Sequence, residues 1–293
     1  MITAVLWMLL TGLIWAAVGV LFSLAPADRE KICSFFALNG ILFTLFVYIS
    51  NFPQAAPVTE VLKLAAVIVP SALMEVIAFL LLKKAMDRGS QGVAWSVVQS
   101  SMVLSFLGAV FILHNPAVPA QWIGMVLILA SLVLFGKAKN NGGKVHNDAV
   151  YYRYVFTAFL LVGGGQFLRI VPGALGLSDA ALSWRLPLQC PWGMLFWMAV
   201  CLKRNCFQFR SVWKFSIPYA VVVTLGQFCF YRATDAADKL KMTSIVVPAA
   251  IGTCIVLFSL YCAVVRKEKM PLCVWLATFM TIAGIALLAV VKA

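Results

Sequence analysis

One carboxylate stands inside an otherwise apolar stretch of this sequence. Residues 69–84 read VPSALMEVIAFLLLKK, with Glu75 near the middle. If this run crosses a bilayer, an ionised Glu75 costs about 2.5 to 3.5 kcal/mol, so the group should face a cavity, meet a partner or carry a proton. It could bind and release H⁺ or hold a cationic or hydroxylated solute. It could equally be a protonated structural group, hydrogen-bonded to a neighbouring helix or to Ser71, which lies one helical turn earlier on the same face.

A second chemical pattern places an amide between large apolar side chains. Trp95, Gln99, Met102 and Phe106 follow one another at steps of four, three and four residues, which is one continuous face of a helix. An aromatic platform beside an amide suits a sugar ring, a quaternary amine or a planar metabolite. The same face could instead pack against neighbouring helices, although Gln99 would still need a hydrogen-bond partner. Near the start of the chain, Trp7, Thr11 and Trp15 follow at four-residue steps in a similar pattern, and Trp15 lies deep inside the first predicted helix.

The second half of the chain offers further polar positions inside apolar runs. Gln166 follows three glycines, 163–165, whose missing side chains favour close helix packing. Gln227 and Tyr231 share one helix face, and the proline-rich stretch 184–202 predicts a kinked helix near a site. Our prediction is that seven residues contact the solute, with Glu75 also carrying the coupled proton: Trp15, Glu75, Trp95, Gln99, Gln166, Gln227 and Tyr231.

Other reactive groups are sparse and point away from catalysis. Arg169 and Arg185 flank one loop, and we expect both to reach outward to lipid headgroups, with solute binding as the alternative. The eight cysteines are scattered with no C-x-x-C pair, which predicts reduced, buried thiols and no metal site. Motifs of membrane or soluble hydrolases are absent from the sequence, so we expect neither an enzyme nor a cofactor.

Composition shows which elements must position these residues. Hydrophobic residues make up 63% of the 293 and charged ones only 11%, a balance outside that of soluble domains. Helices of about 18 or more apolar residues can span a bilayer, because they satisfy their own backbone hydrogen bonds. We predict an all-α membrane protein with ten transmembrane helices: Val5–Leu24, Ile32–Ser50, Leu64–Leu82, Gly92–Leu113, Ala120–Gly136, Tyr154–Ile170, Trp184–Leu202, Phe215–Tyr231, Met242–Val265 and Pro271–Val291.

The net charge of +13 comes from lysines and arginines in loops and at helix ends, which favours lipid headgroups over nucleic acid as partners. Sixteen of the 23 follow the odd-numbered predicted helices, and seven lie on the opposite face. By the positive-inside rule, we expect the sixteen, Lys83 and Lys84 among them, to face the cytoplasm, and both termini to face away from it. The expected location is a bacterial inner membrane.

The sequence carries an internal repeat. Residues 69–87, VPSALMEVIAFLLLKKAMD, align with 217–235, IPYAVVVTLGQFCFYRATD, at a single offset of 148. Pro70 meets Pro218 and Asp87 meets Asp235, and we expect the two aspartates to be caps and surface ion pairs. Five helices per copy means that the second copy is inverted in the membrane, so we predict two inverted-topology five-helix repeats, 1–143 and 150–293. Glu75 has no counterpart, because the offset reaches Val223.

These features resemble the drug/metabolite transporter superfamily, in its ten-helix, EamA-like form. The resemblance rests on the five-plus-five pattern, the junction KKAMDRGSQGVAWSVVQSS, its echo YRATDAADKLKMTSIVVPAA and the closing helix QWIGMVLILASLVL. It implies a membrane transporter of small solutes. The basic residues in APADREK, after the first helix, are similar to the rhamnose and glucose uptake branches, whereas many exporters keep both termini cytoplasmic.

Sequence and resemblance together lead to one main functional hypothesis. We expect a secondary active transporter that moves a small organic solute by alternating access, with proton-coupled uptake of a sugar-like or other polar metabolite first. Export of amino acids or amphipathic compounds is the second possibility. A non-transporting membrane scaffold or sensor is the alternative of a different class.

Overall fold

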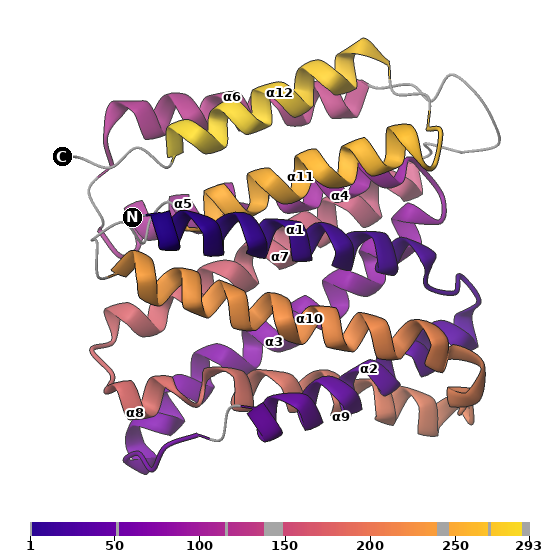
Figure 1. The fold of residues 1–293 in the computed structure, drawn as a ribbon, viewed down its shortest axis with the longest axis vertical. Helices are drawn as coiled ribbons and strands as arrows, with labels where there is room; N and C mark the ends of the chain where they lie inside the picture. Colours follow the sequence, from indigo (N-terminus) through magenta and orange to yellow (C-terminus); the bar gives the residue numbers. More distant parts are fainter. Residues whose placement is uncertain are drawn as a thin grey trace.

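The computed structural model describes residues 2–50, 53–114, 117–137, 149–238, 246–268 and 271–288, and in these ranges it contains helices and no strands (Figure 1). The first half contains α1 (Ile2–Leu24), α2 (Arg29–Ser50), α3 (Val58–Met86), α4 (Gln91–Gln99), α5 (Met102–Phe111) and α6 (Pro119–Lys137). The second half contains α7 (Ala149–Ala174), α8 (Asp179–Leu182), α9 (Arg185–Arg204), α10 (Phe209–Asp238), α11 (Val246–Val264) and α12 (Leu272–Leu288).

These helices correspond to the ten predicted spans. The short α8 lies in the connection between α7 and α9, while α4 and α5 are the two parts of one span, Gln91–Phe111. Within the described residues, five helices are long and apolar enough to cross a membrane: α1, α2, α3, the α4–α5 span and the first part of α10. The expectation of an all-α membrane protein is confirmed. The boundary between the predicted domains lies at 144–149, mostly outside the described residues.

Local sequence explains where several helices begin and end. The Asp28 carboxylate accepts the backbone N–H groups of Glu30 and Lys31, at 2.9 and 3.1 Å, and so caps α2. The Ser90 hydroxyl accepts the Val93 N–H in the same way at the start of α4. Asn205 ends α9 in the left-handed conformation, with a φ of 49°, a role that asparagine fills when glycine does not.

The span of α4 and α5 departs from our prediction of a continuous helical face. Ser100 and Ser101 form a turn between the two helices, and the N–H groups of Val103 and Leu104 bond to their carbonyls at 3.2 and 2.9 Å. Such i to i+3 bonds tighten the chain and interrupt the α-helical ladder. Gln99 therefore ends α4 beside the cavity described below, whereas Phe106 of α5 packs in a separate apolar cluster.

The helix neighbours follow the two-fold relation expected of an inverted repeat. In Figure 1, α6 and α12 lie side by side at one edge of the bundle, and α2 and α9 at the other. Each of these pairs joins a helix to its own repeat counterpart. Other major contacts occur in pairs, in which each helix is replaced by its repeat counterpart. The contact of α3 with α7 corresponds to that of α10 with α1, and the contact of α3 with α9 corresponds to that of α10 with α2.

Glycines set the close approaches in this arrangement. A Cβ on Gly12 of α1 would lie 2.5 Å from the Ala250 carbonyl oxygen of α11, and one on Gly163 of α7 would lie 2.7 Å from the Ser101 carbonyl oxygen. The two contacts join corresponding spans, since each pairs the first helix of one half with the fourth span of the other. The expectation that residues 163–165 mediate close packing is confirmed, since the Cβ position of Gly165 lies 3.3 Å from the Ser71 carbonyl oxygen.

Lys83 lies elsewhere than predicted. We expected it beside Lys84 at the membrane surface, but its side chain is buried, and its Nζ contacts Asp87 Oδ1 at 2.7 Å and the Ser23 carbonyl oxygen at 3.3 Å. Lys84 instead lies over the Tyr154 ring, 5.7 Å from its centroid. Asp87, an exposed residue at the C-cap of α3, thus forms an ion pair, but its partner is this inward lysine. The side chain of Asp235 lies outside the described part of the structure.

Candidate functional site

A cavity of about 240 Å³ lies at the centre of the bundle, where helices from both halves of the chain meet. Its walls carry aromatic side chains and polar side chains, the latter including amides and two charged groups. The aromatic members are Trp15, Phe36, Phe43, Phe79, Trp95, Trp197 and Tyr219, and the polar members are Asn39, Glu75, Gln99, Gln166, Arg169, Gln189 and Gln227. An apolar enclosure with a few converging polar groups is the general form of a small-molecule site.

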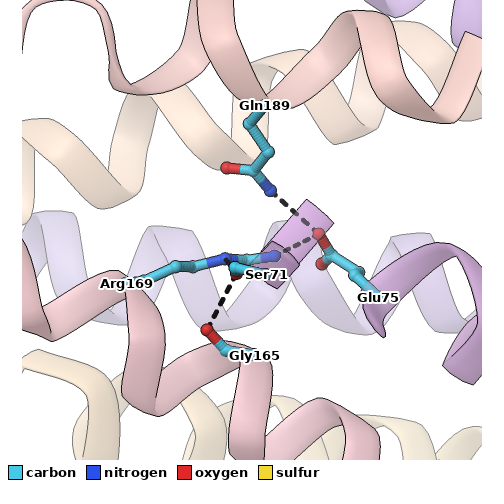
Figure 2. Close-up of polar contacts among 5 residues, drawn as sticks. All are labelled: Ser71, Glu75, Gly165, Arg169 and Gln189. Carbon is cyan, nitrogen blue, oxygen red and sulfur yellow. Dashed lines mark hydrogen bonds and ion pairs between the residues drawn. The ribbon is translucent and has the colours of Figure 1, made fainter. Parts of the chain in front are cut away.

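Glu75 is the centre of the polar contacts (Figure 2). Its Oε2 atom is paired with Arg169 Nη2 and accepts a hydrogen bond of 2.8 Å from Gln189 Nε2. The carboxylate comes from α3, the guanidinium from α7 and the amide from α9. Three helices, two of them in the second half, therefore meet at one oxygen atom.

Ser71 connects this group to the backbone of α7. Its hydroxyl donates to the Gly165 carbonyl oxygen at 2.8 Å and accepts from Arg169 Nε at 3.2 Å (Figure 2). We considered a bond between Ser71 and Glu75 itself, but the serine holds the partner of Glu75 instead. Because Ser71 is fully buried, it fixes the direction in which the Arg169 side chain leaves α7.

The pairing with Arg169 explains how a charged Glu75 is accommodated between the helices. The side chains of Glu75 and Arg169 are 27% and 28% exposed, so neither is fully hydrated and neither is fully removed from water. An opposite charge and additional hydrogen bonds offset the loss of solvation in such a place. Glu75 is consequently held as part of an ion pair with a hydrogen-bonded amide, in a cavity that both halves line.

The side chain of Arg169 points inward, contrary to the prediction from the sequence. We expected it to reach the outer headgroups, as a basic residue in the last turns of a predicted span. It turns inward because α7 packs closely against α3 through Gly165, which brings Ser71 and Glu75 within reach. The sequence contained one usable signal: Arg169 lies one helical turn after Gly165 and so shares a face with it.

Six of the seven predicted site residues line the cavity: Trp15, Glu75, Trp95, Gln99, Gln166 and Gln227. The seventh, Tyr231, lies in α10, and its side chain is outside the described part of the structure. Lining a cavity is a position and not yet a role, so solute contact stays a prediction for all seven. Gln189 was missed as a site residue, although its helix was singled out for its prolines.

Two lining amides present an oxygen that has no hydrogen-bond partner among the described residues. These atoms are Asn39 Oδ1 and Gln166 Oε1. The other end of the Asn39 amide donates to the Phe35 carbonyl oxygen at 2.9 Å, which sets the direction of the oxygen. Buried acceptors of this kind are costly when they have no partner.

An aromatic cluster packs beside the cavity toward the α1–α2 loop. The ring centroid of Phe22 lies 6.0 Å from that of Phe36 and 6.0 Å from that of Tyr219, and Phe36 also stacks on Trp197 at 4.8 Å. Phe35 joins the cluster through Tyr219, with centroids 5.3 Å apart. These rings come from α1, α2, α9 and α10, so helices of both halves meet there.

The described residues contain no group of three or more His, Cys, Asp or Glu side chains placed to hold a metal ion. All eight cysteines are free thiols, and seven of them are buried. The interpretation of the cysteines as reduced, mostly buried side chains agrees with this arrangement.

Comparison with known proteins places this fold and cavity in a class. The sequence profile of the EamA-like transporter family matches residues 2–136, which extend from α1 into the last turn of α6. The first half of the chain therefore matches this family, which is part of the drug/metabolite transporter superfamily, and the resemblance predicted from the sequence is confirmed. The protein is an integral membrane protein and a transporter of small solutes.

Solved structures agree on the fold across the whole chain. One crystal structure aligns with 97% of this chain and 95% of its own, with a TM-score of 0.58 and 16% sequence identity. At that identity the likeness shows a common fold alone. No curated protein matches the sequence.

Proposed function

We propose that this protein takes up a small polar metabolite by alternating access, coupled to protons through Glu75. The observation that carries the proposal is the Glu75 carboxylate in the central cavity, held by Arg169 and Gln189 and surrounded by amides and aromatic rings. A sugar-like solute fits such walls, because its ring stacks on tryptophan and its hydroxyl groups bond to amides.

The relation between the two halves supports alternating access. The cavity lies where α1, α2 and α3 meet α7, α9 and α10, and the contacts of these helices occur in pairs related by the repeat. Two related bundles around one site can exchange between two openings at similar free energy. The aromatic cluster of Phe22, Phe35, Phe36, Trp197 and Tyr219 would separate and re-form during the exchange.

The polar contacts support a proton-dependent step. A proton on Glu75 removes the negative charge that Arg169 pairs with, while Gln189 can remain hydrogen-bonded to the neutral carboxyl group. Arg169 is then available to the solute. Loading of the site with a proton and with a solute would thus be linked through one residue.

A second candidate is export of amino acids or amphipathic compounds. The observation that favours it is the combination of one acidic and one basic side chain with largely aromatic walls. A zwitterion with an apolar body complements both charges at once. This candidate differs from the first in direction and in solute.

Transport itself is tested with the purified protein. We would screen sugars, polyols, hydroxy acids and amino acids by thermal shift in detergent, since a solute that binds the folded state raises its apparent stability. Each solute that binds is then tested for counterflow in proteoliposomes. We expect at least one to bind and exchange; a protein that binds solute without counterflow is a sensor or scaffold, and the proposal is then wrong.

A further inference from the structure

Among the described residues that line the cavity, Arg169 is the one basic side chain. We infer that the solute is a small monocarboxylate with hydroxyl or amide donors, and that its carboxylate replaces Glu75 on Arg169 while Glu75 takes up a proton. This inference rests on the proposed function and deepens it by naming the class of solute.

The contact between Arg169 and Glu75 does not use all the hydrogen-bond donors of the guanidinium group. Both Arg169 Nη2 and Gln189 Nε2 meet the same carboxylate oxygen, Glu75 Oε2, and Arg169 Nε is bonded to Ser71. Arg169 Nη1 has no hydrogen bond or ion pair among the described residues. A guanidinium group binds carboxylates best through two parallel N–H bonds, which the present pairing does not use. A free carboxylate can approach the Nη1 and Nη2 edge in that two-bonded geometry.

Charge balance in the cavity then requires the proton. Glu75 and Arg169 sum to zero, so an added monoanion leaves one uncompensated negative charge unless a carboxylate is neutralised. Among the described lining residues, the titratable or charged groups that face Glu75 from the other helices are Arg169 of α7, Cys190 of α9 and Tyr219 of α10. The described residues of α1, α2, α4 and α11 contribute none to the lining. Cysteine and tyrosine are already protonated near neutral pH, and arginine keeps its proton. Glu75 is left as the group that accepts H⁺ from solution.

The unpartnered oxygens define the rest of the solute. Asn39 Oδ1 and Gln166 Oε1 accept hydrogen bonds and cannot donate them, so a solute toward which these buried amides turn must carry donors. Hydroxyl or amide groups provide such donors without adding charge. The rings of Trp15 and Trp95 offer apolar surface to the carbon frame. A zwitterion differs, because its ammonium group would pair with the ionised Glu75 and bind without taking up a proton.

The test compares solutes that differ in the carboxylate alone. We would measure binding of gluconate against sorbitol, and of lactate against 1,2-propanediol, by titration calorimetry of the full chain in detergent at pH 5.5, 6.5 and 7.5. Buffers of different ionisation enthalpy report the protons taken up per molecule bound. We expect at least one carboxylate to bind tenfold or more tightly than its neutral counterpart and to take up about one proton, with affinity falling as the pH rises.

Two variants separate the parts of the inference. Glu75→Gln carries a permanently neutral side chain and should remove both the proton uptake and the pH dependence of carboxylate binding. Arg169→Gln should lose the tenfold preference for the carboxylate. If Arg169→Gln unfolds, the Glu75→Gln titration still decides, because proton uptake that persists in it overturns the inference.

The remaining outcomes are also decisive. Neutral counterparts that bind as tightly as the carboxylates, or amino acids that bind with no proton uptake while no other carboxylate binds, overturn the class of solute. Counterflow of those neutral or zwitterionic solutes would leave transport standing. Absence of counterflow for every solute that binds removes the proposed function instead, so the two failures are distinguishable.

Discussion

Glu75 and Arg169 come from different halves of the chain and meet at the centre of the protein, where each side chain is about a quarter exposed. Loss of one partner leaves the other as a half-buried charge with no counter-charge among the cavity-lining residues, whereas loss of both leaves only polar and apolar walls. Gln189 has a subtler part, since it donates to the carboxylate at 2.8 Å without adding charge. The ion pair and the amide should therefore respond differently to substitution.

The first prediction concerns the ion pair. Arg169→Gln should lower the free energy of unfolding by about 1 to 3 kcal/mol, because Glu75 then lacks its charged partner. Arg169→Gln together with Glu75→Gln should recover at least half of that loss. Thermal unfolding in detergent of both variants and of Glu75→Gln alone completes the cycle, and equal losses in the single and double variants would contradict a coupled pair.

The second prediction concerns Gln189. Gln189→Leu removes a hydrogen bond from the ionised carboxylate, worth about 1.5 to 3 kcal/mol, so Glu75 becomes easier to protonate. The pH midpoint of solute transport should move upward by about 1 to 2 units. Gln227→Leu is the matched control, since Gln227 lines the same cavity but has no contact with Glu75 among the described residues. A midpoint that moves equally in both variants would argue against this role of Gln189.

At the scale of the helices, the spans and their repeat could be predicted from apolar length and the shared Pro70 and Pro218, since both signals lie within single segments. The direction of Arg169 could not, because it depends on how closely α7 approaches α3 at Gly165. The break at Ser100 and Ser101 was also missed, since serine in an apolar run is compatible with a continuous helix. Four predicted residues that line the cavity, Glu75, Gln99, Gln166 and Gln227, could be placed from the sequence because a polar group inside a span has few places other than a cavity.

A third prediction concerns the close contact between α2 and α9. A Cβ on Gly40 would lie 2.6 Å from Met194 Cα, which is backbone and cannot move aside alone. Gly40→Val should push the two helices apart, lower the thermal stability and reduce solute binding. Gly176→Ser is a contrast, since nothing lies within 4 Å of its Cβ position, although its φ of 60° adds some strain. Thermal unfolding that ranks Gly176→Ser as the more damaging would contradict the packing argument.

A fourth prediction concerns the start of α2. The backbone N–H groups of Lys31 and Glu30 hold the pKa of the Asp28 carboxyl below its ordinary value of 3.8. A lowered pKa means that this cap stabilises the fold above about pH 4 and is lost as the pH falls through the lowered value. Asp28→Ala should reduce stability at pH 7, while Asp28→Asn should keep the cap and lose its acid sensitivity. Unfolding at pH 7 and pH 3 for both variants checks the sign.

At the scale of the whole molecule, the proposed alternating access requires the two halves to separate at one end and close at the other. The cluster of Phe22, Phe35, Phe36, Trp197 and Tyr219 joins helices of both halves near the α1–α2 loop. Cys206 is buried at that end, where its carbonyl oxygen accepts a hydrogen bond of 2.6 Å from Ser34. Its accessibility should therefore report the opening of that end.

The fifth prediction uses this thiol. In a variant that keeps Cys206 as its sole cysteine, a water-soluble maleimide should react slowly at rest and faster when a transported solute is cycling. Phe36→Ala should raise the resting rate, because it removes the ring that stacks on Trp197. A labelling rate indifferent to both changes would mean that this end does not open during transport.

Accumulation of solute against its concentration gradient shows directly whether Glu75 couples solute to protons. Proteoliposomes containing the wild-type protein should concentrate a solute identified by counterflow when the outside is more acidic than the inside. With Glu75→Gln, counterflow should continue while concentration driven by the pH gradient disappears. Accumulation by Glu75→Gln with the wild-type dependence on the pH gradient would mean that Glu75 does not carry the coupled proton.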